Sequence, residues 1–116
     1  MATAEEPMEE AVVEWINGYL TALKGTVQLS EAAMQAIAGD YGPRHIRLRD
    51  GKLYYSRDST DVAALRALLA QSEDTFFIEG VTYFKLQVVF GEHGAPLKLV
   101  GHYEGGGTDE TPRDPT

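Results

Sequence analysis

The chain contains no cysteine among its 116 residues, which excludes disulfide bonds, thiolate metal sites and cysteine nucleophiles. It also lacks any apolar run approaching the ~20 residues that a membrane-spanning helix needs. Basic residues are few: ten Lys and Arg stand against eighteen Asp and Glu, for a net charge of −8. Because affinity for nucleic acid depends on cations that neutralise phosphates, we expect no nucleic-acid partner, and we expect no membrane span.

The beginning of the chain lacks the basic and apolar regions of a signal peptide, and residues 1–6 are predicted to be disordered. The location is left open as cytoplasmic, or periplasmic if a signal peptide has been removed. The length predicts one domain, which we assign to residues 7–104. Residues 105–116 are polar and rich in Gly and Pro, so they are predicted to be a flexible tail.

Two helices are predicted in the first third of the chain. Apolar residues recur at helical spacing before a Lys-Gly pair, which predicts a helix over residues 8–24. Ser30 is a suitable N-cap for a second, shorter helix that continues to about Ala38.

A β-hairpin follows the helices. Asp50-Gly51 is typical of a two-residue type I′ turn, because both central residues of that turn need positive φ. The turn pairs Arg49 with Lys52, and cross-strand partners share one face of the sheet. One face of the hairpin is then basic and the other is apolar. The residues predicted to face the core are Ile46, Leu48, Leu53 and Tyr55.

Two further strands are predicted at residues 75–78 and 83–90 from their β-branched and aromatic content. A tight turn at Gly80-Val81 would pair Phe77 with Phe84 and place both on the core face. A four-residue loop at 91–94 would then continue the meander and would pair two further sets of residues, Val88 with Leu97 and Leu86 with Leu99.

The opposite face of this predicted sheet is partly apolar, which indicates that something covers it. The helix that carries Trp15, from this chain or from a partner, is the candidate cover. Residues 62–69 are ambiguous: their Ala and Leu content favours a helix, whereas their period-two alternation permits a strand.

No arrangement typical of catalysis is recognisable. The three histidines, His45, His93 and His102, do not have the spacing of a metal motif. Adjacent carboxylates lie at predicted element ends and in the tail, and no serine lies in a nucleophile elbow. We therefore predict a protein that is not an enzyme and has no cofactor and no metal.

The compact polar cluster at residues 40–44 lies where the second helix leads into the first strand, a common place for a loop that contacts a ligand. The residues predicted to bind a ligand are Tyr41, Arg44, Tyr55, Phe77 and Phe84. The residues predicted to form an interaction surface are Trp15, Tyr19 and Tyr83.

A family resemblance covers roughly residues 33–104. It is carried by Ala38-Gly39-Asp40-Tyr41-Gly42-Pro43-Arg44, by Ile46-x-Leu48-x-x-Gly51-x-Leu53-Tyr54-Tyr55, by the Ser-Glu-Asp-Thr-Phe segment at 72–76, and by a strand that ends in Phe before a Gly turn at 84–94. These segments resemble the β-rich, lipocalin-like domain that follows the catalytic domain in bacterial tail-specific serine peptidases and β-lactamase-related serine hydrolases. Such domains carry no catalytic residues, so the resemblance implies an accessory or binding role. It also implies a strand over residues 62–69.

These elements predict an α+β fold, with one or two N-terminal helices packed on an antiparallel meander of five or six strands that forms a half-barrel or a small barrel. The first functional hypothesis is a non-enzymatic accessory or protein-interaction domain, including self-association as a homodimer through the N-terminal helix. The alternative is a carrier that binds a small apolar ligand inside the meander, which requires a cavity of several hundred Å³.

Overall fold

The computed structural model describes residues 7–25, 27–59 and 61–115, and these residues hold two α-helices, one short 3-10 helix and eight strands. The predicted disorder of residues 1–6 lies outside them. In chain order the elements are α1 Pro7–Leu23, α2 Glu31–Ile37, β1 Gly39–Tyr41, β2 Arg44–Arg49, β3 Lys52–Arg57, η1 Val62–Ala64, β4 Arg66–Ala70, β5 Thr75–Ile78, β6 Val81–Phe90, β7 Pro96–Tyr103 and β8 Thr108–Pro112.

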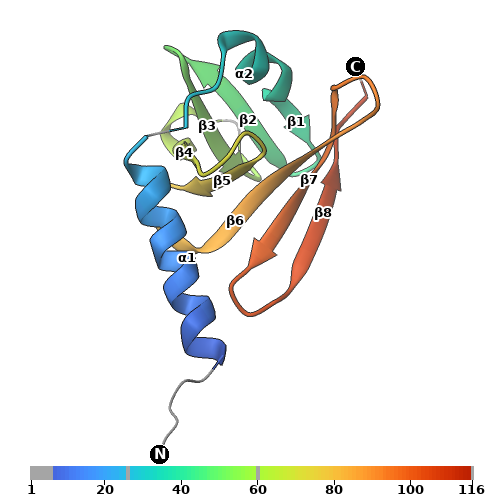
Figure 1. The fold of residues 1–116 in the computed structure, drawn as a ribbon. Coiled ribbons are helices and arrows are strands. Elements are labelled where there is room, and N and C mark those ends of the chain that lie inside the picture. Colours follow the sequence, from blue (N-terminus) through green and yellow to red (C-terminus); the bar gives the residue numbers. More distant parts are fainter. Residues whose placement is uncertain (1–6, 26, 60, 116) are drawn as a thin grey trace, which may run out of the picture.

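The strands form an antiparallel meander in which each strand pairs with the next one along the chain. The sheet curls into a nearly closed barrel, with α1 along the outside of β4, β5 and β6 (Figure 1). The α+β class with N-terminal helices is confirmed. The expected count of five or six strands is wrong, because the described residues form eight. The two missed strands are β1 and β8, whose short sequences read as a loop and a tail.

The predicted hairpin is confirmed. Asp50 and Gly51 have φ of 52° and 76°, as a type I′ turn requires. Leu48 pairs with Leu53 and Ile46 pairs with Tyr55. Ile46, Leu53 and Tyr55 are buried, and Leu48 is partly buried against the same core.

The ambiguous segment at 62–70 contains both kinds of structure. Residues 62–64 form the single turn η1, and Arg66–Ala70 forms β4. β4 lies between β3 and β5, where Arg66 is the cross-strand partner of Tyr55 and Leu69 is the partner of Phe77. The strand interpretation is therefore right for Arg66–Ala70.

The predicted pairing of Phe77 with Phe84 is wrong. Phe76 pairs with Leu86, Phe77 pairs with Lys85, and a bulge separates Phe77 from Ile78. The turn is placed differently from the predicted one, and a slip of one residue moves every side chain to the other face. Phe77 consequently lies on the outer face, and Phe76 and Ile78 point into the core.

The loop between β6 and β7 is longer than predicted. Val88 pairs with Leu99 instead of Leu97, Leu86 pairs with Gly101 instead of Leu99, and a bulge follows Val89. This shift of two residues keeps Leu99 in the core, since side-chain direction has a period of two. Leu97 is the extra residue of the bulge, because Val89 pairs with Lys98 and Phe90 pairs with Pro96, and 55 % of it is exposed.

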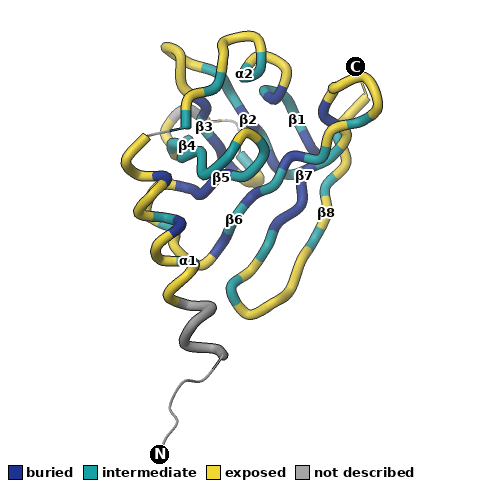
Figure 2. Tube along the Cα trace, viewed as in Figure 1, coloured by how far each residue is buried: buried dark blue, intermediate teal, exposed yellow. Residues whose placement is uncertain are grey.

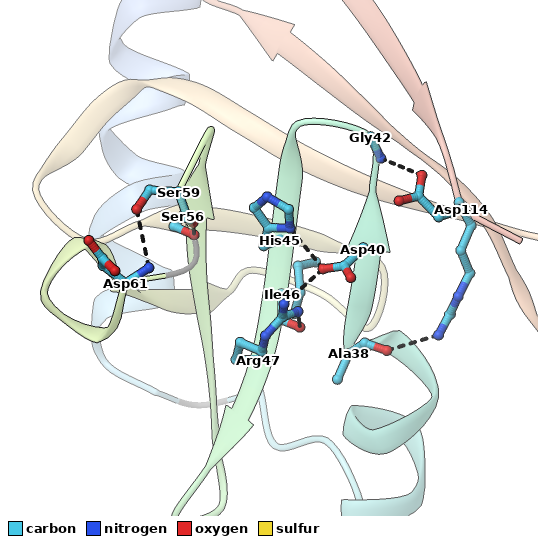
Figure 3. A network of polar contacts seen from close by, with 11 residues as sticks. Ala38, Asp40, Gly42, His45, Ile46, Arg47, Ser56, Ser59, Asp61 and Asp114 are labelled. Atoms are coloured by element: carbon cyan, nitrogen blue, oxygen red, sulfur yellow. Dashed lines mark hydrogen bonds and ion pairs between the residues drawn. The ribbon is translucent and has the colours of Figure 1, made fainter. Parts of the chain in front are cut away.

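The end of the chain extends the sheet and contacts its first edge, so the predicted flexible tail is wrong for residues 108–114. β8 pairs with β7 along its whole length. The Asp114 N–H then donates to the Asp40 carbonyl at 2.9 Å, and the Asp114 carboxylate accepts from the Gly42 N–H at 2.9 Å (Figure 3). The Arg113 guanidinium donates to the Ala36 and Ala38 carbonyls. These bonds join the segment after β8 to β1.

The helix that carries Trp15 covers the outer face of the sheet, as predicted, but the residue it covers is Phe77, which the sequence placed on the core face. Trp15 and Tyr19 meet the Phe77 ring edge to face, with ring centroids 6.1 and 5.4 Å away. The Tyr19 hydroxyl accepts from the Gly80 N–H at 2.7 Å. No helix of the described residues has the length and apolarity to cross a membrane.

The core lies inside the barrel, where buried positions alternate with partly buried ones along β2, β3, β6 and β7, whereas much of α1 is exposed (Figure 2). The buried core residues are Ile37, Tyr41, Ile46, Leu53, Tyr55, Phe76, Ile78, Phe84, Leu86, Val88 and Leu99. Their side chains occupy the space that the strands enclose.

Candidate anion-binding pocket

A pocket of about 370 Å³ opens at one end of the barrel. It lies where β2, β4 and β6 begin and where β3, β5 and β7 end. We call it the arginine pocket. It is lined by Arg44, Tyr55, Ser56, Arg57, Ala64, Arg66, Ile78, Val81, Tyr83, Phe84 and Tyr103. The volume is within the range of small-molecule sites.

Three of the lining residues are arginines that share the inner face of adjacent strands. Arg44 on β2 is the cross-strand partner of Arg57 on β3, and Arg66 on β4 is the partner of Tyr55. Tyr55 and Arg57 are two residues apart and therefore point to the same side. Like charges directly opposite one another destabilise a sheet, so this arrangement is unfavourable unless anions balance it.

Arg44 is completely buried, and the barrel balances its charge. Its Nη2 donates to Asp109 at 2.7 Å, its Nη1 donates to Thr111 at 3.2 Å and its Nε donates to the Tyr55 hydroxyl at 3.3 Å. The guanidinium also lies over the Phe84 ring, 5.5 Å from the centroid. Burial works to lower the pKa of Arg44, but the hydrogen bonds with Asp109 and Tyr55 outweigh burial and raise the pKa. The side chain therefore remains charged.

Gly101 allows this ion pair to form. A Cβ at position 101 would lie 2.6 Å from Arg44 Nη2, 2.6 Å from Asp109 Oδ1 and 2.7 Å from the Phe84 ring. No side chain fits at these distances, so the approach of Arg44 and Asp109 across β7 requires glycine here.

The other two arginines are not balanced in this way. Arg57 contacts the Asp58 carboxylate at 3.7 Å, and both side chains are well exposed, so this contact is weak. Its charge also helps to lower the pKa of Asp109, but among the described residues Arg57 forms no salt bridge with Asp109. Within the described part of the chain Arg66 forms no salt bridge. Arg57 and Arg66 therefore give the mouth of the pocket a local positive charge on a protein whose net charge is −8.

The inner wall of the pocket is apolar and aromatic. Tyr55 and Phe84 belong to the buried core, and Ile78 is also buried. Tyr103 packs on Phe84 with centroids 5.0 Å apart, and its hydroxyl donates to Asp109 at 3.0 Å. An apolar wall beneath a cationic mouth is complementary to an amphipathic anion.

Three of the five predicted ligand-binding residues line this pocket: Arg44, Tyr55 and Phe84. The other two lie elsewhere. Tyr41 is buried, and its hydroxyl donates to the Ile37 carbonyl at 2.7 Å. Phe77 lies under α1. Among the predicted interaction residues, Trp15 and Tyr19 pack on the barrel, and Tyr83 is 61 % exposed at the pocket.

The sequence reasoning missed Arg57 and Arg66. The position of Arg57 could have been predicted, because the register set by the Asp50-Gly51 turn places residue 57 opposite Arg44 when the hairpin is extended. The position of Arg66 depends on whether residues 62–69 form a strand, which the local sequence leaves open.

A second polar group, Asp40, His45 and Ser56, forms a row across β1, β2 and β3 (Figure 3). The Asp40 carboxylate contacts His45 Nδ1 at 2.8 Å and the Arg47 guanidinium at 2.9 Å. A nucleophilic serine needs a hydrogen bond to its base. The buried Ser56 hydroxyl instead donates to the Ser59 carbonyl. We therefore interpret this row as polar contacts that help to hold β1, β2 and β3 together.

Acid should destabilise the protein through two of these carboxylates. Hydrogen bonds from His45 and Arg47 lower the pKa of Asp40. Burial works to raise the pKa of Asp109, but its hydrogen bonds with Arg44 and Tyr103 lower it. When folding lowers the pKa of a carboxyl group, that group stabilises the folded state at pH values above its unfolded pKa, here 3.8. This stabilisation is lost as the pH falls through the pKa of the folded state.

We therefore expect Asp109→Asn to be less stable than the wild type at neutral pH and to lose less stability between about pH 5 and about pH 3. Urea midpoints across this range measure both effects. Glu92→Gln, at an exposed turn position, is the matched control and should keep the wild-type profile. Parallel profiles for Asp109→Asn and the wild type would contradict the assignment.

The fold and pocket together define a helix-covered antiparallel β-barrel with an arginine-rich mouth. No protein-family model, curated protein or solved structure matches the chain. The resemblance to accessory domains of serine peptidases and hydrolases therefore stays a prediction.

Proposed function

We propose that this protein binds a small amphipathic anion in the arginine pocket. The anionic head lies between Arg57 and Arg66, and the apolar body lies against Tyr55, Ile78 and Phe84. This proposal modifies the carrier hypothesis in two respects. The ligand carries a negative charge, and it sits at the end of the barrel because side chains fill the interior.

The observation that carries the proposal is the placement of three arginines on one inner face, where the one close ion pair with Asp109 is made by Arg44. Arg44 and Arg57 are directly opposed, and like charges in that position destabilise a sheet. An anion at the mouth accepts charge-assisted hydrogen bonds from Arg57 and Arg66, which are roughly twice as strong as neutral ones.

Calorimetric titration with three probes tests the proposal. Decanoate has both a charge and an apolar chain, decanol has the chain without the charge, and acetate has the charge without the chain. We expect decanoate to bind and the other two to bind at least about tenfold more weakly, a difference of roughly 1.4 kcal/mol for each missing part. Equal affinity for decanoate and decanol would exclude an anion site.

A pair of matched double variants identifies the arginines responsible. Arg57→Gln with Arg66→Gln removes two charges from the pocket. Arg49→Gln with Lys52→Gln removes two charges from the exposed opposite end of the same hairpin. We expect the first variant to weaken decanoate binding about tenfold or more and the second to leave it unchanged. Equal weakening by both variants would show that only the overall charge matters.

The interaction-domain hypothesis has support from a different surface. Helix α1 exposes a row of apolar side chains away from the barrel, which is the feature that a protein partner would contact.

A further inference from the structure

Four large apolar side chains on α1 are exposed although the helix is packed against the barrel. Val13, Ile16, Leu20 and Leu23 are 43–54 % exposed. Their spacing of three, four and three residues is that of the a and d positions of two coiled-coil heptads. We call these four residues the α1 stripe. It is about 15 Å long at 1.5 Å per residue.

The stripe belongs to a helix that its own barrel already holds in place. Trp15 and Tyr19 contact Phe77, and Gly18 and Ala22 are buried against the sheet. Lys85 Nζ lies 4.3 Å from the centre of the Trp15 ring. A short isolated helix would have to be nucleated before it could bind. Here the free-energy cost of forming the helix is already offset by its packing on the barrel, so the stripe can bind another surface without it.

The stripe is complementary to itself when two helices run in opposite directions. In antiparallel packing an a residue meets a d residue of the second helix. Val13 then lies opposite Leu23 of a second copy, and Ile16 lies opposite Leu20. Both pairs are centred on position 18, so one two-fold axis satisfies all four layers, as a symmetric dimer requires.

The charges along the helix favour the same direction. Glu14 lies near the start of the stripe, and Lys24 follows the last residue of α1; both are exposed. In an antiparallel pair, Lys24 of each copy lies toward the Glu14 end of the other copy. A parallel pair would place like charges side by side.

We infer that α1 pairs antiparallel with α1 of a second copy, and that the α1 stripe is the centre of a two-fold homodimer interface. The arginine pocket lies at the barrel mouth and contains no residue of the stripe. The two sites are therefore independent, and failure of one proposal leaves the other intact.

Sedimentation equilibrium over a dilution series tests the dimer. We expect the wild type to shift from monomer to dimer as concentration rises. Leu20→Lys should remain monomeric. Thr21→Lys introduces the same residue at the next position, which is also exposed, and should dimerise as the wild type does. Because both substitutions lie on exposed positions, circular dichroism should show unchanged folding. A wild-type monomer at every concentration would overturn the inference.

Disulfide trapping tests whether the two α1 helices run antiparallel. Because the chain has no cysteine, an introduced cysteine can pair only with its copy in the second protomer. In the antiparallel dimer the two copies of position 17 meet at the axis, whereas the two copies of position 24 are about 20 Å apart or more. Asn17→Cys should therefore cross-link under mild oxidation and Lys24→Cys should not. Equal cross-linking of the two variants would overturn the antiparallel arrangement.

Discussion

Replacing Arg44 with alanine is expected to lower the free energy of unfolding by about 2–5 kcal/mol, mainly because a large buried side chain is removed. The substitution removes a side chain with no exposed surface and leaves Asp109, Thr111 and the Tyr55 hydroxyl without their partner. It also empties the space beneath Phe84. Urea unfolding with an unchanged m-value measures the loss.

A second pair of variants separates the charge from the packing. Arg44→Met retains most of the side-chain volume but still leaves Asp109 unpaired, so we expect it to be less destabilising than Arg44→Ala and still clearly destabilising. Adding Asp109→Leu removes the carboxylate that has lost its partner and should recover part of the loss. Because the Asp109 side chain is 41 % exposed, we expect that part to be small. A loss below about 1 kcal/mol in Arg44→Ala would show that the network contributes little.

Replacing Phe77 with alanine is expected to cost about 3–5 kcal/mol and to release α1 from the barrel. Phe77 is fully buried, and its ring is the surface on which Trp15 and Tyr19 rest. Trp15 is the single tryptophan of the chain, so its fluorescence reports the docking of α1 directly. We expect its emission to shift to the red in folded Phe77→Ala.

Phe76→Ala is the matched control for this effect. Phe76 is the neighbouring buried phenylalanine, but it points into the barrel. Its removal should cost a similar free energy and leave the Trp15 emission of the folded protein unchanged. Decanoate binding should persist in Phe77→Ala, because Phe77 lies outside the pocket. Unchanged Trp15 emission in Phe77→Ala would contradict the conclusion that α1 is held on the barrel by packing against Phe77.

The parts of the fold that could be predicted are those determined by neighbouring residues. Asp50-Gly51 sets one turn type, and the arginines on one side of the hairpin prevent a slip of register, so residues 46–55 were predicted correctly. The helical spacing before Gly25 was equally sufficient for α1.

The predictions that were wrong concern features of the fold that depend on contacts between residues far apart in the sequence. The bulge after Phe77 changes the face of that residue, and nothing in the local sequence marks it. β8 has a composition typical of a tail, and β7 is what makes it a strand. The candidate site shows the same division. Arg44 and Tyr55 could be predicted from the hairpin, whereas Arg66 required the path of β4.

The bond between the Asp114 N–H and the Asp40 carbonyl has a consequence for synthesis on the ribosome. Strands β2 to β8 can form hairpins one after another as they emerge, because every pairing is with the preceding strand. β1 is the first strand to emerge, yet the residues that cover its free edge are made after all eight strands. A nascent chain therefore carries an open strand edge until translation has passed Asp114, and open edges recruit other chains.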